Sequence, residues 1–190
     1  MAGELVDQID PGKLFRESST GYDLVGFSAQ TPVLPTMANS VMRGVSLQKI
    51  NPGSASGTPA VAYEWYNFLT TIPTNLTITT GLTFFFTVTD DGANAADLGL
   101  VIKIGIAVKK LTTGVNCDLS TGAGTEQTAT VTLNATTGLT AQYTLAIANA
   151  NLNGAGAGDQ IGVRIRRMGA DAADTCLGRV ILIGGHIKNT

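Results

Sequence analysis

The chain has 190 residues, a formal net charge of −2 and a charged content of 14 %, which is well below the roughly 25 % of an average globular protein. Its hydrophobic content of 44 % suits one domain with a core. The small net charge gives no general attraction to nucleic acid or anionic lipid, and no apolar run reaches the roughly 18 residues of a membrane helix.

Residues 1–57 differ in character from the rest of the chain. They contain four of the six prolines, show no sustained alternation, and run into the turn-rich stretch NPGSASGTP. Apolar pairs nevertheless recur, which is unusual for a disordered tail. We therefore expect an extended N-terminal arm that lies on the chain's own sandwich or on a neighbouring subunit. The pairs that would anchor it are Leu5-Val6, Leu14-Phe15, Leu24-Val25, Val33-Leu34 and Val41-Met42.

The expected result of deleting this arm depends on whether it binds the chain's own sandwich or a neighbouring subunit. An arm bound to a neighbour predicts that removing residues 1–52 leaves a folded β-domain with weaker attachment. In the alternative, Leu24 to Phe27 or Val41 to Leu47 adds a strand to the chain's own sandwich, and the truncated chain unfolds. The alternating segments after residue 57 already supply two inner faces, so we expect the first result.

From residue 58 the apolar pattern takes a period of two, which predicts a β-domain over 58–190. The clearest segment is 100–108, in which five aliphatic residues form one face of a strand. Phenylalanines and threonines alternate in the segment LTFFFTVTD. The expected strands cover 58–72, 82–90, 100–108, 128–134, 140–149, 161–167 and 179–189.

The order of these segments predicts an all-β fold. No helical window is long enough to supply a crossover, which excludes a doubly wound α/β fold. Seven or eight strands around one core indicate an antiparallel β-sandwich of jelly-roll type. The short turns, including NATTGL, predict that consecutive strands pair, and that the last two strands form a terminal hairpin.

Arginines are concentrated near the C-terminal end of the sequence. Arg164 and Arg166 alternate with apolar residues, so both lie on the outer face of a strand. That face is either solvated or presents guanidinium groups to acidic or amide partners across a subunit interface. Together with the arm, it gives the candidate interface residues Leu14, Phe15, Val33, Leu34, Val41, Met42, Arg164 and Arg166.

The sequence offers no recognisable catalytic set. His186 is the only histidine, no GxSxG motif occurs, and no set of residues has the spacing of zinc ligands. The stretch GAGAGDQIG precedes a strand and opens no helix, so it is a turn and no phosphate loop. The acidic loops DDGANAAD and GADAAD lack the calcium-loop pattern. We expect no enzyme activity, no cofactor and no metal.

Two further features bear on location and ligands. Cys117 and Cys176 are predicted to be reduced thiols, because the acidic start of the chain has no secretory character and indicates folding in a cytoplasm. The aromatic cluster YEWYNF fills the core or, in the alternative, forms a sugar-stacking platform around Trp65.

The last third of the chain carries a resemblance. A Thr-rich strand and YTLAI precede a Gly158-Asp159 turn, the strand and loop RIRRMGADAADT, and a final strand RVILIGGHI. This order, over Leu98 to Ile187, resembles small virion structural proteins of tailed bacteriophages. RIRRMGADAADT is the most specific part of the resemblance.

The resemblance implies a capsid decoration or cement protein with a jelly-roll sandwich, which bridges major capsid proteins on the virion surface. It implies a homo-oligomer, with a trimer favoured, and the low charge also indicates a partly covered surface. A tail, fibre or neck component and a carbohydrate-binding module are the alternatives. No nucleic-acid or membrane partner is expected.

Overall fold

A computed structural model describes residues 5–9, 15–18, 21–24, 45–47, 65–90, 98–115, 119, 122–169, 171–176 and 180–190. These parts of the chain form eleven strands and one short 3₁₀ helix at Asn149–Asn151. The strands are β1 (Leu5–Ile9), β2 (Phe15–Ser18), β3 (Gly21–Leu24), β4 (Val45–Leu47), β5 (Trp65–Thr71), β6 (Gly81–Asp90), β7 (Val101–Leu111), β8 (Gln127–Thr132), β9 (Ala141–Ala148), β10 (Gln160–Arg167) and β11 (Val180–Asn189).

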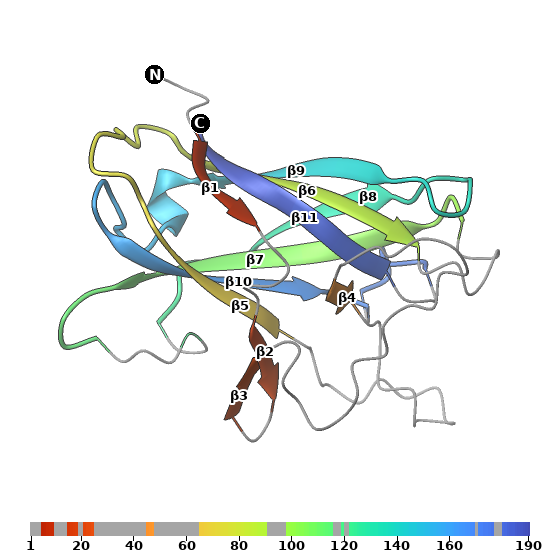
Figure 1. Ribbon diagram of the computed structural model, residues 1–190, viewed down its shortest axis with the longest axis horizontal. Helices are drawn as coiled ribbons and strands as arrows, with labels where there is room; N and C mark the ends of the chain where they lie inside the picture. The colour runs from red at the N-terminus through yellow and green to blue at the C-terminus, as the bar shows by residue number, and fades with distance from the viewer. Residues whose placement is uncertain are drawn as a thin grey trace.

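The strands form two antiparallel sheets that pack face to face. Sheet A has the order β1-β11-β6-β9, with β4 also paired to β11, and sheet B has the order β3-β2-β5-β10-β7-β8. Figure 1 shows the two layers, with β11, β6 and β9 in one and β5, β10 and β7 in the other. The fold is thus the all-β sandwich that the alternating pattern predicts.

One hydrophobic cluster joins the inner faces of the two sheets. Sheet B contributes the even-numbered aliphatic residues of β7 and the odd-numbered ones of β10, and sheet A contributes Phe84, Phe86 and their neighbours. The predicted inner face of 100–108 is confirmed, because its members from position 102 onward are fully buried. Residues with no exposed surface include Leu82, Phe84, Val88, Ile102, Ile104, Ile106, Val108, Ile161, Val163 and Ile165.

The expectation that consecutive strands pair is wrong for most of the domain. β8 and β9 lie in different sheets, and so do β10 and β11, so the C-terminal segment is no hairpin. A period of two reports which residues face the core, but it is the same whether a loop turns back within a sheet or crosses to the other one. The described loops mostly cross, and β7 with β8 is a consecutive pair that remains in one sheet.

The described parts of residues 1–57 lie on the chain's own sandwich. β1 pairs with β11 at the edge of sheet A, and β2 pairs with β5 and with β3 in sheet B. β4 pairs with the start of β11 and overlaps the segment Val41 to Leu47 that the sequence offered as an alternative strand. The sequence allowed the arm to lie on its own sandwich or on a neighbouring subunit, and these four segments lie on their own sandwich.

Strand β1 also contributes to the core. Val6 and Ile9 are 8 % and 3 % exposed and belong to the central cluster, whereas Leu5 on the same strand is 50 % exposed. The register of β1 on β11 shifts between Leu5 and Asp7, and this irregularity lets both Val6 and Ile9 turn inward.

We predict that Ile9→Ala lowers the free energy of unfolding by about 2–4 kcal/mol, because it leaves a cavity between the sheets. The matched control is Leu5→Ala on the same strand, which should change stability by less than about 0.5 kcal/mol. Urea denaturation followed by circular dichroism measures both. Equal effects of the two substitutions would show that β1 is not part of the cooperative fold.

Candidate interaction surfaces

The structure places three of the eight candidate interface residues. Phe15 lies in β2, where its backbone pairs with Asn67 of β5. Arg164 and Arg166 lie in β10 on the outer face of sheet B, opposite in direction to the buried Ile165. The other five candidates lie outside the described residues: Leu14, Val33, Leu34, Val41 and Met42.

Arg166 is engaged within its own chain. Its Nε donates to Oε1 of Glu126 at 2.7 Å and its Nη2 donates to Oε2 at 2.5 Å, which is a bidentate ion pair. The Glu126 carboxylate lies over Gly105 of β7, where a Cβ would overlap it. An acidic partner for Arg166 is therefore supplied within the chain, by the segment that leads into β8. Whether Arg166 also contacts a neighbouring subunit stays a prediction.

Arg164 is covered as well. It is only 6 % exposed, and Lys109 beside it on β7 is 3 % exposed, although both belong to the outer face of sheet B. The buried Leu119, which follows β7, packs over Gly162 of β10 so closely that a Cβ there would overlap its side chain. Part of this sheet face is thus covered by the chain itself, which removes it from the accessible surface.

Arg167 forms the most buried ion pair among the described residues. Its Nε donates to Oδ2 of Asp174 at 2.8 Å and its Nη2 donates to Oδ1 at 2.6 Å, with side chains that are 1 % and 0 % exposed. The same guanidinium donates to the carbonyl of Cys176. The Lys103 amide completes the site by donating to Oδ2 of Asp174 at 3.1 Å. Burial is tolerated because the charges are paired and hydrogen-bonded.

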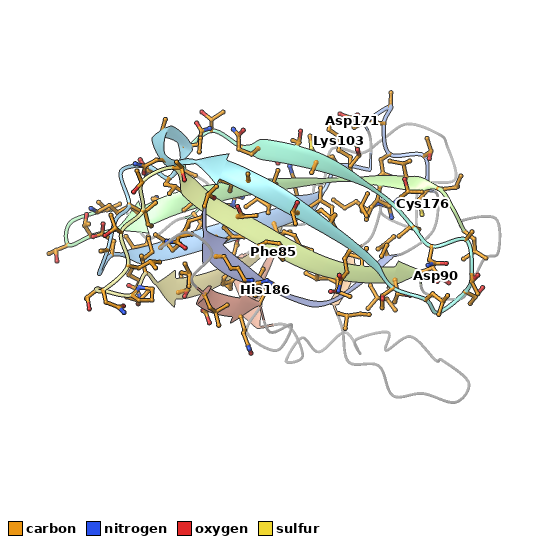
Figure 2. All side chains as sticks on the ribbon, turned by 90° about the horizontal axis from the view of Figure 1, so that it is seen from above. Phe85, Asp90, Lys103, Asp171, Cys176 and His186 are labelled. Atoms are coloured by element: carbon orange, nitrogen blue, oxygen red, sulfur yellow. The ribbon has the colours of Figure 1, made fainter. Side chains whose placement is uncertain are left out.

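This ion pair fixes the loop between β10 and β11 to the start of β7. The Met168 amide donates to the Lys103 carbonyl at 2.8 Å, and the Thr175 amide donates to the Val101 carbonyl at 2.8 Å. Lys103 Nζ lies 2.7 Å from Oδ2 of Asp171, and that hydrogen bond holds the pKa of Asp171 below its usual value. Figure 2 shows Lys103 and Asp171 close together along the upper edge of the molecule in that view. RIRRMGADAADT is therefore a strand and a loop clamped onto β7.

Three acidic residues from these two sequence stretches have partners within the described chain, whereas Asp91 and Asp97 lie outside the described residues. Asp171 and Asp174 hold Lys103 and Arg167, and buried Asp90 accepts the amide of Gly138 at 2.9 Å in the turn before β9. Within the described ranges, no three His, Cys, Asp or Glu side chains form a group that could hold a metal ion. In those same ranges, no helix is long and apolar enough to span a bilayer.

The outer face of sheet A carries an aromatic pair. The rings of Phe85 and His186 stack with centroids 4.5 Å apart and an interplanar angle of 11°, and Lys188 Nζ lies 5.4 Å from the Phe85 centroid. Figure 2 shows Phe85 and His186 together near the middle of the molecule. Buried Nε2 of His186 has no hydrogen bond to any described residue. Burial, with a smaller contribution from Lys188, lowers the pKa of His186.

The sugar-platform hypothesis gains no support from this pair. Phe85 already stacks against His186 and has Lys188 over its ring, so little aromatic surface remains for a sugar. Trp65 lies in β5, but its side chain is outside the described residues, so the original form of that hypothesis stays a prediction.

Sequence reasoning missed the partners of the arginines. Glu126 is 40 residues from Arg166 in sequence and precedes a different strand, and no local pattern connects them. Asp174 lies seven residues after Arg167, in the loop that follows β10, and this short separation was the signal available for predicting a pair. No protein-family model matches the chain, and no curated protein sequence matches it.

We predict that Arg167→Met lowers the free energy of unfolding by about 3–5 kcal/mol, because it leaves the Asp174 carboxylate buried without its partner. The control is Lys103→Met, which removes only the more exposed pair with Asp171 and should have a clearly smaller effect. Denaturant unfolding measures both. Similar losses in the two variants would contradict the special role of the buried pair.

We predict that protonation of His186 destabilises the fold. Its pKa in the folded protein is below the ordinary 6.5, so the folded state binds this proton less tightly than the unfolded chain does. The stabilising contribution of the neutral ring is complete above about pH 6.5 and is lost as the pH falls through the lowered value.

The free energy of unfolding is measured by urea denaturation at several pH values between 5 and 8, the range in which a histidine titrates. His186→Gln should flatten the dependence in this window, and because the chain has one histidine no other imidazole contributes. A wild-type stability that does not change across the window would refute the prediction.

Proposed function

We propose that this chain is a structural virion protein that decorates and stabilises a bacteriophage capsid by bridging capsid subunits. The observation that carries the proposal is the strand order. In a jelly roll of eight strands, one sheet holds the first, eighth, third and sixth strands, and the other holds the second, seventh, fourth and fifth. The strands from β4 to β11 follow this order. Jelly rolls are common among viral capsid domains, although they also occur in lectins.

The clamped loop gives a second line of support. RIRRMGADAADT, the segment most similar to phage virion proteins, supplies two arginines to bidentate ion pairs and two aspartates to contacts with β7 or β10. These residues hold strands and a loop in place. Such a use of charge suits a scaffold that must remain rigid on a shell, because bidentate ion pairs fix the relative positions of the strand, the loop and the neighbouring sheet.

The proposal includes partners and location. The chain is made in the host cytoplasm, binds the major capsid protein at the capsid surface, and associates with copies of itself, with a trimer favoured. It is not proposed as an enzyme, and no cofactor, nucleic acid or membrane takes part. The low charged content of 14 % supports a surface that is partly covered in an assembly.

Electron microscopy of virions that carry the protein tests this function. We expect density for the sandwich in symmetry-related copies over the icosahedral shell, at sites between capsid subunits. Particles that lack the protein should release their genome at a lower temperature in a thermal-shift assay with a nucleic-acid dye.

The control is the same particle with the purified full chain added back, which should restore both the density and the stability. Density confined to the tail, fibre or neck would refute the capsid proposal and favour the alternative structural role. Absence of the chain from purified virions in quantitative gel analysis would refute both.

A further inference from the structure

Strand β9 is an edge strand along its full length. It pairs with β6 from Gly81 to Val88, and no described strand lies on its other side. In an antiparallel pair, alternate residues direct their N–H and C=O groups away from the partner strand. Along the outer side of β9, these groups have no partner strand among the described residues and can pair with another strand.

This edge lacks the features by which proteins usually prevent edge pairing. β9 has the sequence AQYTLAIA, without charge, proline or glycine, and its register on β6 is continuous over eight residues. The opposite edge of the same sheet differs, because β1 is interrupted by a register shift and carries Asp7. Charges, short length and bulges are the common means of blocking an edge.

The side chains beside the edge permit close approach. Gln142, Thr144, Ala146 and Ala148 point outward and are small or uncharged. Leu139, two residues before the strand, is 51 % exposed, the largest value among the exposed large hydrophobic residues of the described chain. An apolar side chain of this size at the end of a pairing edge gains by burial.

The sequence of β9 is compatible with antiparallel pairing to a second copy of itself. If a twofold axis passes through Thr144, that residue lies opposite Thr144 of the partner subunit, and Tyr143 lies opposite the partner's Leu145. Other registers are possible in which the twofold axis passes through a different residue of β9. In each of them the inward side chains of both copies remain on the inner face of the extended sheet, because side chains alternate with a period of two.

We propose that β9 is an interaction surface for a second copy of this chain, and that two copies pair antiparallel along β9 to extend sheet A across a twofold axis. The pairing satisfies the outer backbone groups of both strands and covers Leu139. It does not depend on the proposed capsid function, and it is a contact additional to the threefold one of an expected trimer.

The test uses the full chain with lysines on the edge. In the double variant Thr144→Lys/Ala146→Lys, lysines of the two copies lie opposite each other when the twofold axis passes through or near residue 144. We expect the mass of the assembly in sedimentation velocity to halve at concentrations where the wild type is paired, with pairing weakened about tenfold or more.

The matched control is Thr130→Lys/Thr132→Lys on β8, which adds the same charges at exposed positions of the other sheet's edge. It should keep the wild-type mass, and all three proteins should have similar melting temperatures, because the substituted residues are largely exposed. Hydrogen exchange gives a second readout, in which 141–148 should lose protection in the β9 variant while 127–132 does not.

Three results would overturn the proposal. A wild type that is not paired at high concentration would show that the edge is unused, and so would a β9 variant with unchanged mass. Loss of pairing only in the β8 variant would assign the contact to the other sheet. Virion microscopy bears on the capsid function and not on these outcomes, so the two proposals can fail separately.

Discussion

The packing of two alternating inner faces against each other is the constraint on which the rest of this structure depends. Phe84 and Phe86 from one sheet share a single cluster with the isoleucines of β7 and β10 from the other. Because every second residue of these strands must face the cluster, the outward positions are fixed too. The same constraint that fills the core therefore places Arg166, Phe85 and Thr144 on the outer surfaces, where the specific contacts of this chain occur.

Sequence periodicity predicted the strands from residue 81 onward with ends within a few residues, because burial of one face leaves a local trace. It could not predict which strands pair. Loops that cross between sheets and loops that turn within one carry the same turn residues, and so β10 and β11 were expected to form a hairpin. Strands β1, β2 and β3 were not predicted, because strands of four or five residues are too short to show a period, whereas β4 falls within the alternative strand Val41 to Leu47.

The candidate interface shows the same division between local and long-range information. Alternation placed Arg164 and Arg166 on the outer face of β10, and this followed from neighbours one residue away. Their surroundings come from the segment that follows β7, which supplies Leu119 and Glu126. A charged residue on an outer face is thus insufficient to indicate an external partner. The sequence of β9 did not indicate an exposed edge, because it contains no unusual residue. Its capacity to pair with another strand depends on its position at the edge of sheet A.

The arginines of β10 have a consequence for how accurately the chain folds. A slip of β10 by one residue against β7 would reverse every side chain and turn Arg164 and Arg166 inward, away from Glu126 and into the isoleucines. Burying unpaired guanidinium groups there costs far more than the backbone hydrogen bonds of a shifted ladder could return. The charged positions of β10 thus disfavour the shifted register relative to the native one, in addition to any preference that the core itself provides.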